Sequence, residues 1–126
     1  MTLSSLVRLF LAITAPFNVP AGIAFAWPAS GIGQFNGMPP TSNPFYGWMA
    51  GGVIAIFGFA YATMAWSGVF SRGLLAVGAA GKTFAVIISW IAAASALLPT
   101  STAVFMTGDL IFASLWVWYL LQSTKG

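Results

Sequence analysis

The chain has 126 residues, of which 60% are hydrophobic and only 4% are charged, whereas about 25% of the residues in an average soluble domain are charged. Its mean hydropathy is +0.94. Five charged side chains cannot cover the surface of a soluble protein of this size, so lipid is the expected solvent for most of the chain. This composition excludes a soluble globular enzyme, a nucleic-acid-binding module and a disordered tail.

Most of the residue types that build catalytic and metal sites are missing. The chain has no Cys and no His, which excludes disulfides, thiol chemistry, and zinc, copper or haem sites that use those side chains. Asp109 is the sole acidic residue, so neither two-carboxylate catalysis nor an all-carboxylate calcium or magnesium site can form within one chain. We therefore expect a protein that is not an enzyme, with no catalytic residue, no metal and no cofactor.

The first apolar stretch covers residues 3–27. It is long enough to cross a bilayer, because a spanning helix needs about 20 apolar residues. Pro16 and Pro20 lie near its middle, and each removes one backbone donor, so we expect a kink there and a polar partner for the carbonyls left open. A cleaved signal peptide is the alternative, because Ala24-Phe25-Ala26 fits a cleavage site. The prolines within the apolar run favour a retained membrane helix.

Three more apolar stretches follow, at residues 45–66, 74–98 and 102–121. Residues 29–44 are rich in Pro and Gly and are expected to form a polar loop. The two later connections are short, which predicts that the second, third and fourth helices pack as antiparallel neighbours. The sequence thus predicts an all-α fold, an integral membrane four-helix bundle that forms a single transmembrane domain over residues 1–126.

The charges predict the orientation of this bundle. Arg8 lies near the start of the first helix, Arg72 between the second and third, and Lys125 at the C-terminus, whereas the other two loops carry no charge. With four spans, these three positions fall on one side of the membrane. Because Lys and Arg favour the cytoplasmic side, we expect cytoplasmic N- and C-termini and a location in the plasma membrane, as the inner membrane of a bacterium.

Small residues recur at helical spacing on the second and third stretches. Helices in lipid associate through close packing, for which small side chains are suited, although Gly and Ala are common in any membrane helix. We expect the second and third helices to meet along these two faces. The helix-packing residues of the second stretch are Gly47, Gly51 and Gly58, and those of the third are Gly78, Ala85 and Ser89.

The sharpest feature of the sequence is a charged residue of each sign inside neighbouring spans, Lys82 and Asp109. Each charge alone would cost about 2.5–3.5 kcal/mol at the bilayer centre, and the helical rise puts the two at depths that a lysine side chain can bridge. We expect an ion pair inside the bundle. Asn18 and Tyr61 lie at similar depths on the first two helices and complete an intramembrane polar centre. Candidates to extend it are Thr14, Thr83, Ser89 and Thr107.

Short motifs in all four stretches resemble those of a broad group of small bacterial four-helix membrane proteins, the DoxX-like proteins. The motifs are Pro16-Phe17-Asn18 with Gly22, Gly58-Phe59-Ala60-Tyr61, Gly81-Lys82 and Gly108-Asp109-Leu110-Ile111-Phe112-Ala113. The resemblance implies the four-helix membrane architecture and transfers no catalytic residue. Many members of that group have no assigned activity, and others are regarded as membrane subunits of quinone-linked oxidoreductases.

Three functional hypotheses follow. The first is a non-enzymatic membrane component, either an accessory subunit of a larger assembly or a self-associating bundle, whose partners are membrane lipid, other membrane subunits or second copies, and not nucleic acid. The second is a transporter or channel for a small solute or protons that uses the Lys82–Asp109 pair; the same pair could instead only fix helix register. The third is a binding protein for a lipid, quinone or carotenoid in an apolar groove near Phe105, Phe112 and Trp116, whose helical spacing also fits simple packing.

Overall fold

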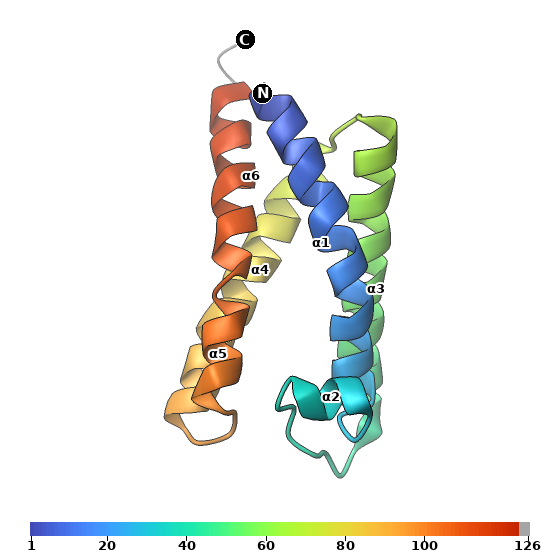
Figure 1. Cartoon of the computed structure of the whole chain (residues 1–126), viewed down its shortest axis with the longest axis vertical. Coiled ribbons are helices and arrows are strands. Elements are labelled where there is room, and N and C mark those ends of the chain that lie inside the picture. The colour runs from blue at the N-terminus through green and yellow to red at the C-terminus, as the bar shows by residue number, and fades with distance from the viewer. Residues whose placement is uncertain (124–126) are drawn as a thin grey trace.

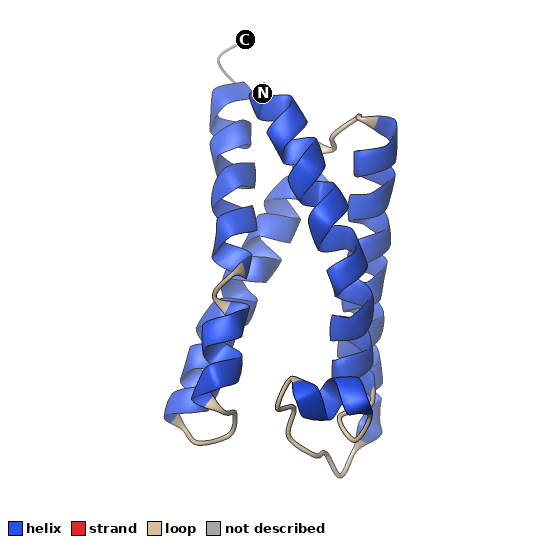
Figure 2. Cartoon of the chain, in the orientation of Figure 1, coloured by secondary structure: helices blue, strands red, loops and turns tan. Residues whose placement is uncertain are grey.

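The computed structural model describes residues 1–123, which form helices joined by loops and turns, with no strand among them (Figure 2). Helices α1 (Leu3–Ala26), α3 (Pro44–Ser67) and α4 (Arg72–Ala94), together with the segment Thr100–Gln122, are long and apolar enough to cross a membrane. That fourth segment is divided into α5 (Thr100–Met106) and α6 (Asp109–Ser123), and a short helix, α2 (Gly31–Phe35), lies between α1 and α3. The four predicted apolar spans are therefore four helical segments.

Polar side chains and one glycine define where the long helices begin and end. The Thr2 and Ser71 hydroxyls accept hydrogen bonds from backbone N–H groups in the first turns of α1 and α4, and Asn43 does the same for α3. Such caps satisfy donors that the first helical turn leaves open. At the other end of α3, Gly68 has φ of 72°, the left-handed conformation that glycine adopts without a Cβ penalty.

Two local features of the structure were not predicted from the sequence. Residues 29–44 are not a continuous loop, because Ser30 caps the short helix α2. The fourth span is not one continuous helix either, because hydrogen bonds tighten at Thr107–Gly108 to the three-residue pattern, as from Gly108 N to Phe105 O. Glycine is a poor helix former, and the Thr107 hydroxyl donates to the Ala103 carbonyl, which disturbs the regular ladder.

The helices form two pairs, which we call the first helix pair (α1 and α3) and the second helix pair (α4 with α5 and α6) (Figure 1). Helix α1 packs along α3 and also contacts α6. The backbones of α3 and α4 share no extended contact, although they follow one another in the sequence. The prediction that the second and third helices pack as neighbours was therefore wrong, because α1 takes the place beside α3.

The same correction applies to the small-residue faces. The face of α3 that carries Gly47, Gly51 and Gly58 packs against α1: a Cβ on Gly51 would strike the Gly22 carbonyl oxygen, and one on Gly58 would lie 2.6 Å from the Asn18 Cβ. On α4, a Cβ on Gly78 would meet side chains of α3 and α6. Ser89 is buried on the same helix, where its hydroxyl donates to the Ala85 carbonyl. The faces serve close packing, but they do not meet each other.

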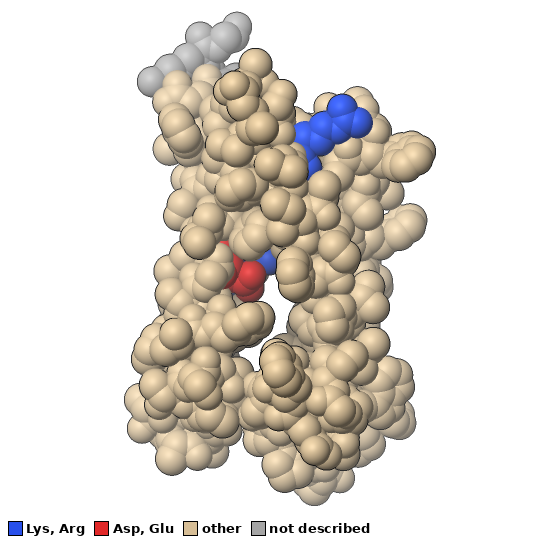
Figure 3. Space-filling view, in the orientation of Figure 1, with Lys and Arg blue, Asp and Glu red and all other residues tan. Residues whose placement is uncertain are grey.

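The apolar core lies toward the end of the molecule where α1 meets α6. Its largest fully buried side chains are Trp116, Leu11, Leu75 and Val7. Toward the opposite end the two helix pairs diverge (Figure 1). They meet again where the Thr102 hydroxyl of α5 donates a 2.8 Å hydrogen bond to the Asn36 carbonyl, just after α2. Figure 3 shows a hollow between the two pairs, which lies between these points of contact.

Arginines close both helix pairs at the same end. Arg8 of α1 donates from Nε to the Ala65 carbonyl and from Nη2 to the Trp66 carbonyl, in the last turn of α3. Arg72 at the start of α4 donates from Nη2 to the Leu120 carbonyl near the end of α6. Terminal carbonyls lack partners within their own helix and carry partial negative charge, so a guanidinium there stabilises each pair.

Candidate functional site

The centre of the molecule holds the predicted ion pair. Lys82 Nζ donates to Asp109 Oδ1 at 3.0 Å, and the two side chains are 9% and 29% exposed. Lys82 comes from the middle of α4, and Asp109 is the first residue of α6. A carboxylate in the first helical turn is favoured by the unpaired backbone N–H groups and the helix dipole. The interruption between α5 and α6 thus puts Asp109 at a helix start that suits its charge.

Three aromatic rings enclose the ammonium group of this pair. Lys82 Nζ lies 5.8 Å from the ring centre of Tyr61, 5.2 Å from that of Phe112 and 5.8 Å from that of Trp116, which we call the ring cage. These distances are within the range of cation–π attraction. Gly78 leaves room for the cage, because a Cβ there would lie 2.7 Å from the Tyr61 hydroxyl oxygen.

The two charged groups differ in access. The Lys82 ammonium is enclosed by the ring cage and the carboxylate, whereas the Asp109 side chain is partly exposed. Figure 3 shows the acidic side-chain atoms at the margin of the hollow between the helix pairs, and Asp109 is the chain's sole acidic residue. A proton or small polar molecule that enters the hollow therefore meets the carboxylate first.

Asn18 does not belong to this centre, contrary to the sequence-based expectation. Its Nδ2 donates at 2.9 Å to the Ile54 carbonyl of α3, so it serves the contact between α1 and α3. The polar centre consists of Lys82, Asp109 and Tyr61. Three of the hydroxyl groups proposed to extend it bond back to their own helices instead, namely those of Thr83, Ser89 and Thr107. The fourth, Thr14, is buried on α1.

The expected apolar ligand groove does not form from the three aromatic residues proposed for it. Phe112 and Trp116 turn inward to the ring cage, and Trp116 is fully buried. Phe105 belongs to α5, beyond the interruption, and is 69% exposed. These residues therefore do not line one binding surface.

The ring cage itself was not predicted, although the sequence carries a signal for it. Asp109, Phe112 and Trp116 are spaced by three and four residues, which puts them on one face of a helix. The structure adds a feature that spacing cannot give: the Trp116 indole Nε1 is buried and has no hydrogen-bond partner among the described residues. A buried donor without an acceptor is uncommon.

No protein-family model matches the chain, and no curated protein or solved structure matches it either. The resemblance to the DoxX-like proteins stays a prediction.

Proposed function

We propose that the chain is an integral protein of the plasma membrane, as the inner membrane of a bacterium, with both chain ends on the cytoplasmic side. Four helices of sufficient length and hydropathy support this insertion. Arg8 and Arg72 support the orientation, because they bond to the last turns of α3 and α6 at one end of the molecule and basic residues favour the cytoplasmic side. Lys125, the third charge in the sequence argument, lies outside the described residues.

Within that membrane, we infer that the protein is a proton-coupled transporter or a proton channel in which Asp109 takes up and releases the proton. The observation that carries this proposal is the position of the Asp109 carboxylate, paired with Lys82 and partly exposed, at the margin of the hollow (Figure 3). Ionisable residues inside membrane spans are costly, and they commonly mark ion or proton paths. The interruption before Asp109 adds support, because discontinuous helices build ion and substrate sites in many transporters.

The proposed cycle uses the ion pair as a two-state contact. A proton that enters the hollow neutralises Asp109 and removes its Coulomb attraction to Lys82, while the ring cage continues to stabilise the ammonium. Helix α6 is then free to change its angle to α5 at Thr107–Gly108, where regular helical hydrogen bonds are interrupted. Loss of the proton to the other side of the membrane restores the ion pair and the starting geometry.

Proton flux in liposomes tests this proposal. Purified protein is reconstituted with a pH-sensitive dye inside the vesicles, and a potassium diffusion potential supplies the driving force. We expect flux above that of protein-free vesicles, with loss of the excess flux in Asp109→Asn. Thr63→Val is the matched control, because Thr63 is an exposed residue of α3 whose hydroxyl bonds to its own helix. Wild-type vesicles without excess flux, or full flux in Asp109→Asn, would contradict the proposal.

A second candidate is the non-enzymatic component of a larger membrane assembly, or a self-associating bundle. The limited contact between the helix pairs favours it: beyond the core, a single described hydrogen bond joins α5 to the segment after α2. In that case the Lys82–Asp109 pair only fixes the register of α4 and α6. Mass measurement of the protein extracted in mild detergent distinguishes the candidates, because an assembly component migrates with other subunits or with further copies of itself.

A further inference from the structure

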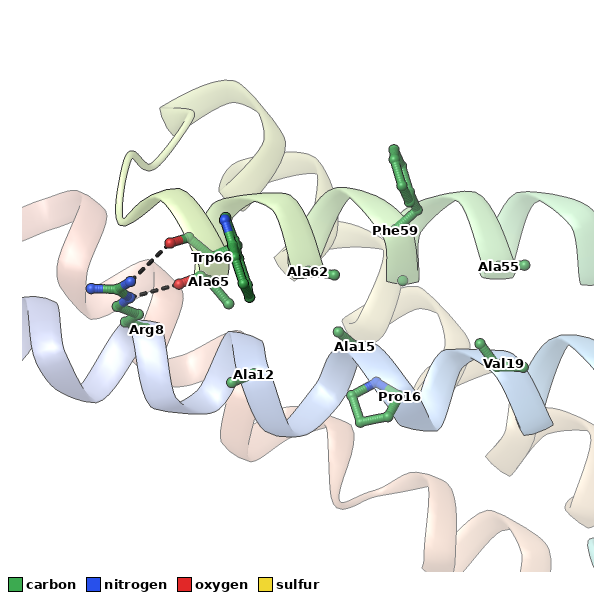
Figure 4. A pocket seen from close by; sticks show the side chains of 11 residues that line it. Arg8, Ala12, Ala15, Pro16, Val19, Ala55, Phe59, Ala62, Ala65 and Trp66 are labelled. Atoms are coloured by element: carbon green, nitrogen blue, oxygen red, sulfur yellow. Dashed lines mark hydrogen bonds between the residues drawn. The ribbon is translucent and has the colours of Figure 1, made fainter.

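A groove runs along the surface between α1 and α3, on the first helix pair (Figure 4). Its volume is about 760 Å³, within the range of about 300–1,000 Å³ that is usual for ligand pockets. Side chains no larger than a methyl group make much of its lining, including Ala12, Ala15 and Ala62, while Phe59 and Trp66 stand beside them. The groove is therefore apolar, elongated and open along one side.

The length of the groove matches one leaflet of a bilayer. It extends from Arg8 to Val19 on α1, which is about 17 Å at the helical rise of about 1.5 Å per residue. Half of a hydrocarbon core of about 30 Å is about 15 Å. The groove is thus long enough for one acyl chain of a single leaflet.

Arg8, at the end of the groove, indicates which charge the head group of a bound lipid carries. Arg8 is held in place by its bonds to the Ala65 and Trp66 carbonyls, and its Nη1 has no hydrogen-bond partner among the described residues. Asp109, the sole acidic residue, is already paired with Lys82. No acidic side chain of this chain can therefore neutralise Arg8. A guanidinium with open donors suits a phosphate group. Because no acidic side chain balances the charge of Arg8, it favours a head group whose phosphate is not already balanced by an ammonium group.

Trp66 adds an interfacial marker beside Arg8. Its side chain is exposed and lies at the same end of the groove. Indole rings favour the head-group level of a bilayer, where the ring contacts apolar chains and the N–H meets polar groups. Arg8 and Trp66 thus mark the head-group end, and Val19 the end near the bilayer centre.

We propose that this groove binds one phospholipid with an anionic head group, with its phosphate on Arg8 and one acyl chain along the alanine-lined floor. On the proposed orientation the site opens to the cytoplasmic leaflet, where anionic lipids attract basic residues. The inference depends on the proposed membrane insertion and not on proton transport, and it concerns a different face of the molecule from the hollow at Asp109.

Native mass spectrometry of the detergent-solubilised full chain tests the site, with phosphatidylglycerol and phosphatidylcholine of identical acyl chains as probes. We expect one phosphatidylglycerol molecule to bind at least about tenfold more tightly than phosphatidylcholine, in line with a charge-assisted contact. Arg8→Gln should remove this preference, whereas Arg72→Gln, which removes a charge at the same end of the other helix pair, should keep it.

A second variant tests the groove without a change of charge. Ala62→Leu fills the floor at an exposed position, and it should weaken phosphatidylglycerol binding about tenfold. Ala80→Leu, at an exposed position of α4 outside the groove, should not. If Arg8→Gln does not fold, this pair of variants still decides the question.

Equal binding of both lipids, or wild-type affinity in Ala62→Leu, would overturn the proposal. A purified complex with a partner helix in this groove and no bound lipid would overturn it as well. Asp109→Asn should retain phosphatidylglycerol binding, so failure of the transport proposal and failure of the lipid site give different results.

Discussion

Lys82 and Asp109 face each other at 3.0 Å, one from the middle of α4 and the other from the first turn of α6. The ammonium is enclosed by rings and the carboxylate is the more exposed partner. Because each charge stabilises the other, removal of one should lower the free energy of unfolding more than removal of both.

Asp109→Asn alone should lower the free energy of unfolding by about 3–5 kcal/mol, because it leaves the enclosed Lys82 charge without its partner. The double variant Lys82→Met with Asp109→Asn should be less destabilised than Asp109→Asn. Unfolding by titration with SDS in mixed micelles measures both values. Simple additivity of the single-variant losses would show that the two residues do not stabilise each other.

Gly51 and Gly52 provide a matched comparison of a packed and an open position. A Cβ on Gly51 would strike the Gly22 carbonyl oxygen, whereas a Cβ on Gly52 meets nothing within 4 Å. Gly51→Ala should therefore destabilise the protein by about 1–3 kcal/mol through separation of α1 and α3. Gly52→Ala should be neutral or stabilising by up to about 1 kcal/mol, because alanine is the better helix former. Thermal unfolding of both variants in the same detergent provides the measurement, and equal effects would contradict the described packing of α1 on α3.

Gly78→Ala should disturb the ring cage. The new methyl group would lie 2.7 Å from the Tyr61 hydroxyl oxygen and 3.3 Å from the Trp116 ring, so one of the rings must move. We expect a loss of about 1–3 kcal/mol together with a shift of the tryptophan near-ultraviolet circular dichroism. Tyr61→Phe removes the oxygen and should reduce the cost of Gly78→Ala. A cost unchanged by Tyr61→Phe would show that Tyr61 does not occupy this place.

Thr102→Val should loosen the contact that joins the diverging ends of the helix pairs. The substitution removes the hydrogen bond from Thr102 to the Asn36 carbonyl, which is worth about 0.5–1.5 kcal/mol. The chain has no Cys, so spin labels can be attached to Ile32→Cys and Val104→Cys, which lie at exposed positions of α2 and α5. Double electron–electron resonance should report a longer or broader distribution of the distance between the two labels in Thr102→Val. In the control Thr63→Val, this distribution should equal that of the labelled protein without either substitution.

The four apolar helical segments and the ion pair could be predicted because their physical causes are strong. A run of about 20 apolar residues is rare in soluble proteins and is typical of a membrane helix. An unpaired charge in hydrocarbon is costly enough that Lys82 requires a partner such as Asp109. Helix pairing was harder, because the glycines of α3 specify a close approach but not the partner. Gly51 proved to accommodate α1 rather than α4.

Asn18 and the interruption at Thr107–Gly108 show a second limit. A side-chain amide near the middle of an apolar helix can donate a hydrogen bond to any nearby carbonyl. Asn18 donates to the Ile54 carbonyl of α3. Gly108 is tolerated inside many membrane helices, so its presence alone did not predict an interruption. The Thr107 hydroxyl also contributes to the interruption, because it donates to the Ala103 carbonyl and so disturbs the regular helical hydrogen bonds.

The division into two helix pairs also bears on synthesis. Arg8 closes the first pair on the last turn of α3, and Lys82 meets Asp109 wholly within the second. A nascent chain inserted as proposed can thus deliver two hairpins to the translocation machinery in succession, with the Lys82–Asp109 pair completed inside the second. Lys82 then needs no counter-charge from the first hairpin, because its own hairpin supplies Asp109.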